Sequence, residues 1–140
     1  MIGYSSFERA AQRLTPLAAT ALRIALGWVF LRHGLTKLHM GLGGVGGFLG
    51  SLGFPLPQAW AAILITLETF GAACVIAGLL TRFWAACFVV DMVVAITRVI
   101  LPNGRGFELE GLLLAGALAL VFLGDGWLAL GQLIGKKSGD

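Results

Sequence analysis

The chain has 140 residues, of which 58% are hydrophobic and only 12% are charged, and its formal net charge is +3. A soluble domain usually carries about 25% charged residues, so these few charges could not cover the apolar surface of a soluble protein of this size. The basic residues are scattered, and several lie inside apolar runs, which excludes a nucleic-acid-binding patch. The composition therefore predicts a single membrane domain, residues 1–140.

Four apolar runs along the chain have the length of membrane-crossing helices. Spans of about 17–25 residues suit a hydrocarbon core about 30 Å thick. The first run is expected to begin at Pro16, and Pro102 must end the third. The expected helices cover residues 16–40, 58–80, 82–101 and 107–123. The predicted fold class is all-α, an integral membrane four-helix bundle.

The connection between the first two helices, residues 41–57, is rich in glycine and contains no charge. It is expected to be either a flexible outer loop or an apolar flap that lies at the membrane interface and covers a site between the helices. Four apolar residues would give such a flap its membrane affinity: Phe48, Leu49, Leu52 and Phe54. The tail, residues 127–137, ends in lysines and is expected to be an interfacial segment.

Basic residues in the short connections predict the orientation, because cytoplasmic loops carry an excess of Lys and Arg. Arg9 and Arg13 precede the first helix, Arg82 lies between the second and the third, and a pair of lysines lies near the end of the chain. In a four-helix bundle these positions share one side, whereas Arg105 lies on the other. Both termini are therefore expected in the cytoplasm, with the glycine-rich connection on the outer side.

The first helix carries several groups that can be positively charged, which is costly in lipid. Each Arg or Lys near the bilayer centre costs about 2.5–3.5 kcal/mol. Arg23, Gly27, Phe30, Gly34 and Lys37 are spaced by steps of four and three and form one stripe. Glycines let a neighbouring helix approach closely. The stripe is therefore expected to face the bundle, with both of its cations pointing inward.

Carboxylates in the other helices are expected to neutralise the inward cations. Counting residues from the helix ends puts Arg23 and Asp91 at a similar depth, which predicts a buried ion pair. The same count brings a second group together in the outer half of the bundle: Glu68, Glu110, Arg98, His33 and Lys37. Such an outer cluster could bind the polar head of a ligand or relay protons. The alternative for both sets is ion pairing that only fixes how the helices pack.

Arg32 and the two cysteines have separate interpretations. Arg32 lies on the face of the first helix opposite to Arg23, so it is expected to contact something outside the chain. A lipid phosphate, a second copy or another subunit could supply this partner, and the depth of Arg32 favours a protein. Cys74 and Cys87 are expected at equal depth, where they either face each other or fill space as small apolar residues. The pattern predicts no metal site.

The runs LRIALGWVFLRHGLTKL, LGFPLP, LETFGAACVIAGLLTR and FELEGLLLAGALALVFLGDG together resemble the DoxX family of small bacterial membrane proteins. The resemblance extends over about residues 20–126. It implies a multi-pass, four-helix protein of the bacterial inner membrane that is associated with redox chemistry. Relatives include a membrane subunit of a thiosulfate:quinone oxidoreductase, and members that assemble with soluble thiol- or sulfur-handling enzymes.

These observations predict the membrane subunit of a redox system that binds a quinone or a similar lipid-soluble carrier at the outer cluster. The sequence shows no motif for a covalently bound cofactor, a flavin or an iron–sulfur cluster, so electrons would come from a partner oxidoreductase. Whether this chain is itself an enzyme stays open. A non-catalytic anchor or assembly subunit is the main alternative, and a proton or small-solute pathway is a further one. A protein partner or a homo-oligomer is expected, and no nucleic acid.

Overall fold

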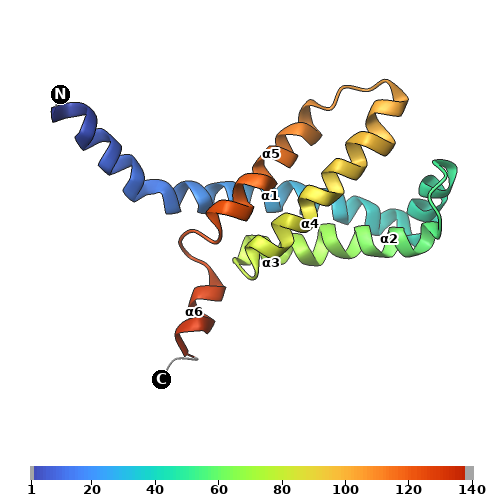
Figure 1. Ribbon diagram of the computed structural model, residues 1–140. Coiled ribbons are helices and arrows are strands. Elements are labelled where there is room, and N and C mark those ends of the chain that lie inside the picture. Colours follow the sequence, from blue (N-terminus) through green and yellow to red (C-terminus); the bar gives the residue numbers. More distant parts are fainter. Residues whose placement is uncertain (1, 138–140) are drawn as a thin grey trace.

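The computed structural model describes the backbone of residues 2–137 and the side chains of residues 6–135. Every regular element in this part of the chain is helical. Figure 1 shows α1 alongside the helix formed by α2 and α3, with α4 and α5 as a second antiparallel pair packed against them. The elements in chain order are α1 (Ile2–Ser51), α2 (Pro57–Thr66), η1 (Leu67–Gly71), α3 (Ala72–Ala77), α4 (Thr81–Val94), η2 (Ala95–Ile100), η3 (Leu101–Asn103), α5 (Glu108–Leu123) and α6 (Leu130–Lys137).

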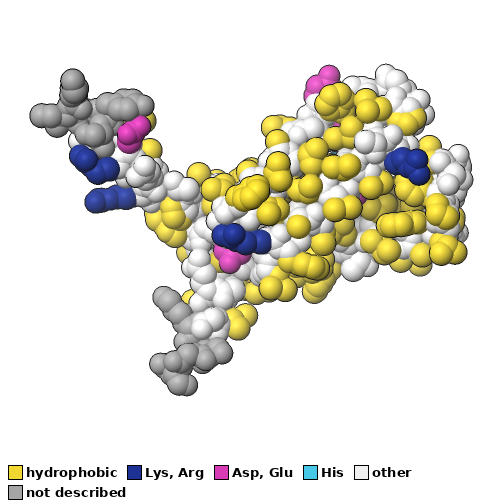
Figure 2. Space-filling model, in the orientation of Figure 1, with side chains coloured by type: hydrophobic (Ala, Val, Ile, Leu, Met, Phe, Trp, Pro, Cys, Tyr) yellow, Lys and Arg dark blue, Asp and Glu magenta, His cyan; other side chains and the backbone are white. Residues whose placement is uncertain are grey.

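Three helical stretches in the described residues are long and apolar enough to cross a membrane: Ser6–Ser51, Pro57–Ala77 and Thr81–Asn103. α5, the expected fourth crossing, is apolar but has only 16 residues. Hydrophobic side chains are spread over the face of the bundle that Figure 2 shows, and few charged ones interrupt them. This surface is that of a helical membrane protein, since a soluble protein rarely exposes so large a continuous apolar area.

The first helix is much longer than the expected 16–40. α1 begins at Ile2, and Pro16 lies inside it rather than at its start. The N-terminal third of α1 points away from the bundle in Figure 1. A proline removes one backbone hydrogen bond and bends a helix, but the helix continues when the residues on both sides favour it. The sequence analysis was wrong to place the helix start at Pro16.

Most of the glycine-rich connection is helical and is not the flexible loop that one of the two interpretations predicted. α1 breaks at Gly41, whose φ of 71° and ψ of 171° lie outside the helical region, and then continues to Ser51. We call residues 42–51 the cap helix. Val45 and Leu49 of the cap helix are buried against Ala61 of α2. This packing at i and i+4 compensates for the low helix propensity of the glycines.

The remaining helices agree with the expected ranges to within about three residues. α3 ends before Gly78, which has a φ of 74°. The amide of Leu79 donates a hydrogen bond of 2.8 Å to the carbonyl of Cys74, which closes the helix end before α4 begins at Thr81. The sequence did not indicate the two π-helical turns, η1 and η2, that interrupt these helices.

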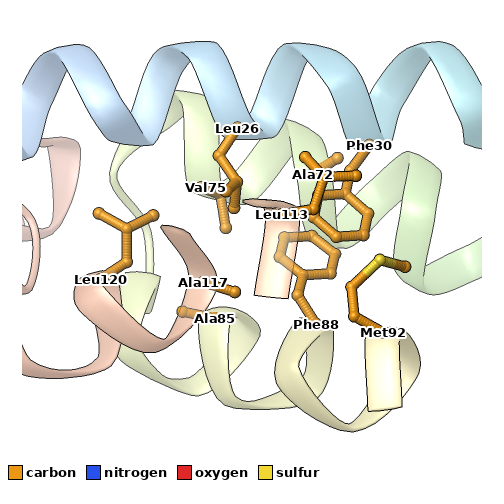
Figure 3. Packing of buried hydrophobic residues seen from close by; sticks show 10 residues of the cluster. All are labelled: Leu26, Phe30, Ala72, Val75, Ala85, Phe88, Met92, Leu113, Ala117 and Leu120. Atoms are coloured by element: carbon orange, nitrogen blue, oxygen red, sulfur yellow. The ribbon is translucent and has the colours of Figure 1, made fainter. Parts of the chain in front are cut away.

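The hydrophobic core joins α1, α3, α4 and α5, as Figure 3 shows. At its centre Phe30 and Phe88 are stacked, with ring centroids 3.9 Å apart and planes within 6° of parallel. Arg23, Gly27 and Gly34 are all buried. The prediction that this stripe of α1 faces the bundle is therefore confirmed.

Beyond α5 the chain turns back under the bundle before it forms α6. Gly124, Gly126 and Leu128 have positive φ angles, which allow the tight path of this connection. α6 then stands apart from the bundle in Figure 1. Its Leu133 and Ile134 are exposed, which suits the expected interfacial role of the tail.

Candidate functional site

Three charged side chains from three different helices meet inside the bundle, and we call them the polar centre. Lys37 of α1 forms an ion pair with Glu68 of η1. Asp91 of α4 lies near this pair, where the charges of Glu68 and Lys37 both act on its carboxyl. Glu68 is 2% exposed and Asp91 is 8% exposed. The polar centre thus consists of two buried carboxyls and one partly exposed ammonium.

A close approach of two backbones positions the ion pair. A Cβ atom at Gly34 would overlap the backbone carbonyl of Glu68. This contact places Lys37, one helical turn after Gly34, beside the Glu68 side chain. Glu68 itself lies in the π-helical turn η1, and such turns occur frequently at functional sites. The glycine is therefore part of the architecture of the site as well as of the fold.

The polar centre lies in the wall of a cavity of about 780 Å³. Phe48 of the cap helix and Phe54 in the following connection line this cavity from one end. Ile63 of α2 and Val90 of α4 also line it and are exposed on the bundle surface. The cavity therefore opens sideways between α2 and α4. The polar lining residues are His33, Lys37, Thr66, Glu68, Asp91 and Glu110, and the other walls are almost entirely apolar.

The cap helix takes the place of the apolar flap that was the second interpretation of the glycine-rich connection. It lies at the cavity and contributes Val45, Phe48 and Leu49 to the lining. The structure agrees with the flap interpretation in that this segment lies against a cavity between the helices, although the segment is helical.

Four of the five residues of the expected outer cluster line this one cavity: His33, Lys37, Glu68 and Glu110. Arg98, the fifth, is exposed and does not line it. Arg98 was placed with the cluster because it follows Asp91 by seven residues, which puts two residues on the same face of an α-helix. The π-helical turn η2, Ala95–Ile100, has wider turns than an α-helix and rotates Arg98 away from that face.

The expected ion pair of Arg23 and Asp91 does not form. Arg23 is 1% exposed, and its Nη2 donates hydrogen bonds to the carbonyls of Trp127 at 3.3 Å and Leu128 at 3.2 Å. The anion whose charge acts on it is Asp125. Depth counting could not foresee this, because these partners belong to the connection after α5, which folds back against α1. Thr20 contacts the same connection, because its hydroxyl oxygen accepts a 2.7 Å hydrogen bond from the Trp127 amide.

Asp91 therefore belongs to the cavity and not to a structural pair with Arg23. Trp84 and Cys87 also line the cavity, and the sequence analysis assigned neither of them to a site. A signal was available, because Trp84, Cys87 and Asp91 are spaced by three and four residues and so share one face of α4. Cys74 does not line the cavity, and both cysteines are free.

Arg32 is exposed on α1, as expected from its position opposite Arg23. With Leu35, Thr36, His39 and Met40 it lines a shallow surface groove of about 490 Å³. Within the part of the chain that the structure describes, no three His, Cys, Asp or Glu side chains are grouped so that they could hold a metal ion.

The family model named DoxX matches residues 18–101. The chain belongs to the DoxX family. Within this DoxX protein the matched residues include the whole polar centre, whereas Glu110 lies beyond the match. No curated protein and no solved structure matches the chain. The family and the apolar helices together identify a membrane protein.

Proposed function

We propose that this protein is the membrane subunit of a redox system, and that it binds a quinone or a similar lipid-soluble carrier in the cavity between α2 and α4. The observation that carries the proposal is the cavity itself, about 780 Å³ in volume and apolar except near the polar centre. A carrier of this class has an apolar tail and a polar ring. The apolar walls would hold the tail, and the polar centre would bind the ring and exchange protons with it.

The proposal includes a partner oxidoreductase as the electron donor or acceptor. The chain's own residues would bind the carrier, orient its ring and hold a proton. Glu68 and Asp91 bring two carboxyls to one wall of the cavity, where they would lie beside the ring of the carrier and could exchange protons with it. Lys37 would offset the charge of Glu68, with which it forms an ion pair.

We further propose a multi-pass topology in the bacterial inner membrane, with α5 as the fourth crossing and both termini in the cytoplasm. Arg9 and Arg13 in the first part of α1 and Arg82 in the first turn of α4 support this orientation, because the N-terminal part of α1 and the start of α4 are at the same end of the bundle in Figure 1. α5 would extend over about 24 Å at 1.5 Å per residue. This is shorter than the usual hydrocarbon core, and local thinning of the bilayer accommodates such a mismatch at modest cost.

Ligand binding in the cavity should protect Cys87 from alkylation. Cys74→Ala leaves Cys87 as the single thiol, and Cys87→Ala leaves Cys74 as a matched control outside the cavity. We expect a benzoquinone with a decyl tail to slow the reaction of Cys87 with N-ethylmaleimide by about tenfold near saturation, and to leave Cys74 unaffected. The quinone must be fully substituted so that its ring has no position open to thiol addition.

The measurement is the alkylation rate by mass spectrometry, on protein in lipid nanodiscs and with increasing quinone. Protection that rises with the quinone concentration and is confined to Cys87 supports the proposal. Equal rates with and without quinone, or equal protection of both thiols, contradict it.

An anchor or assembly role is the second candidate function, and Arg32 is the observation that favours it. An exposed arginine within a membrane-crossing helix is costly unless a partner neutralises it. Arg32 and His39 lie in the same surface groove, where a carboxylate of another subunit or of a second copy would find the Arg32 guanidinium beside the His39 imidazole.

Arg32→Leu is expected to release this partner and leave the protein folded. The leucine suits the exposed apolar face of α1, so the thermal stability of the isolated protein should not fall. Native gels of the mildly solubilised membrane measure the result, with Leu35→Ala in the same groove as the control. A complex that keeps its size in Arg32→Leu rules out Arg32 as a necessary contact.

A further inference from the structure

We infer that His33 and Lys37 bind the two oxygens of the ligand ring, so that the cavity recognises a para-quinone by both of its carbonyls. The inference rests on the proposed function, and it names the feature of the carrier that the site recognises. It follows from the spacing of these two side chains on α1 and from the hydrogen-bond donors that they offer to the cavity.

His33 and Lys37 lie one helical turn apart on the wall that α1 contributes to the cavity. Residues at i and i+4 of a helix share one face, and their Cβ atoms are about 5–6 Å apart. Gly34 between them lies against the backbone of Glu68, which fixes the position of this turn in the bundle. The two oxygens of a para-quinone lie on opposite sides of one six-membered ring, a separation that two side chains at this spacing can span.

Both side chains can be reached by a ligand and carry donors that it can use. The Lys37 side chain is 27% exposed. Its ammonium has three N–H donors, and the ion pair with Glu68 uses one of them. His33 is exposed, and its imidazole carries an N–H in either neutral tautomer. No hydrogen bond or ion pair engages this ring within the described residues, so both groups are free to bond to a carbonyl oxygen.

The sideways opening determines how the ligand would lie. The cavity opens between α2 and α4, at Ile63 and Val90, whereas His33 and Lys37 belong to α1. A tail that leaves through this opening would place the ring deep in the cavity, against α1. The line between the two oxygens would then run along α1. A ligand with one carbonyl would keep the bond to Lys37, because hydrogen bonds from a charged donor are the stronger ones, and would lose the bond to His33.

The experiment crosses two ligands with variants of His33. The ligands share one decyl tail and one fully substituted ring: a para-benzoquinone, and the cyclohexadienone in which a dimethyl-substituted carbon replaces one carbonyl. The readout is the protection of Cys87 from N-ethylmaleimide at a series of ligand concentrations, in Cys74→Ala protein in lipid nanodiscs. Losing one hydrogen bond to a neutral donor lowers affinity modestly, so we expect His33→Leu to bind the quinone about 5- to 10-fold more weakly and the dienone unchanged.

Two further variants separate hydrogen bonding from packing. His33→Gln keeps an N–H donor and should restore most of the quinone affinity. His39→Leu removes an exposed histidine of α1 that does not line the cavity, and it should change the affinity for neither ligand. Because both histidines are exposed, these changes should leave the fold intact, which thermal unfolding checks.

The inference is overturned if His33→Leu changes the affinity for the two ligands equally, or for neither of them. A loss in His33→Gln as large as that in His33→Leu also overturns it. In these cases a quinone that protects Cys87 leaves the proposed function standing. If neither ligand protects Cys87 in protein that retains His33, the proposed function fails as well.

Discussion

Replacing Gly34 with alanine is expected to destabilise the protein by about 3 kcal/mol or more, because overpacking against a backbone cannot be relieved by side-chain rotation. The new methyl group would overlap the carbonyl of Glu68. α1 must then move away from η1, which also separates Lys37 from Glu68. Thermal unfolding in detergent, followed by circular dichroism, measures the loss. The amount of folded protein in the membrane should fall in parallel.

Two other glycines of α1 provide graded controls for Gly34→Ala. A Cβ at Gly27 would meet Cγ1 of Ile76 at 2.7 Å, and this flexible side chain can move, so a smaller loss is expected. A Cβ at Gly47 would have no neighbour within 4 Å, and Gly47→Ala should be neutral or slightly stabilising because alanine favours a helix. If all three variants unfold at the same temperature, the close approach at Gly34 does not limit stability.

Replacing Arg23 with leucine is expected to cost about 3 kcal/mol or more, because two hydrogen bonds from a charged donor are lost. The carbonyls of Trp127 and Leu128 would lose their partner, and Asp125 would lose the cation that attracts it. The connection after α5 should then detach from α1. Limited proteolysis and amide hydrogen exchange of residues 124–129, together with thermal unfolding, measure the effect.

Arg32→Leu is the matched control for Arg23→Leu, because it makes the same chemical change on the exposed face of α1 and should leave residues 124–129 protected. Combining Arg23→Leu with Asp91→Leu should give the sum of the two single losses, since the two residues have no shared partner. If the double variant is more stable than the sum of the two single losses implies, Arg23 and Asp91 do interact, as the sequence analysis predicted.

Several features of the site could be predicted from the sequence because they depend on the regular helical spacing of α1. The stripe from Arg23 to Lys37 needed only helical spacing, and it faces the bundle as predicted. Residue counting from the helix ends put Glu68 in the outer half of the bundle with Lys37 beyond it, and the two form the ion pair of the polar centre.

The predictions that were wrong each depended on a departure from regular helix. A π-helical turn is set by tertiary packing and has no local sequence signal, so Arg98 was placed on the wrong face. The partner of Arg23 is a pair of backbone carbonyls, and such a partner leaves no charged residue to be counted. The cap helix is rich in glycine, and only its contact with α2 makes it helical.

The sideways opening of the cavity between α2 and α4 affects how occupancy must be measured. Ile63 and Val90 at this opening are exposed apolar residues, so the proposed ligand would arrive from the acyl chains and not from water. Occupancy then follows the mole fraction of ligand in the bilayer. When the ligand is strongly lipophilic, diluting a vesicle suspension with buffer should not change the occupancy of the cavity. Adding vesicles that contain no ligand should lower the occupancy. Affinities for such a site are comparable only when they are expressed per lipid.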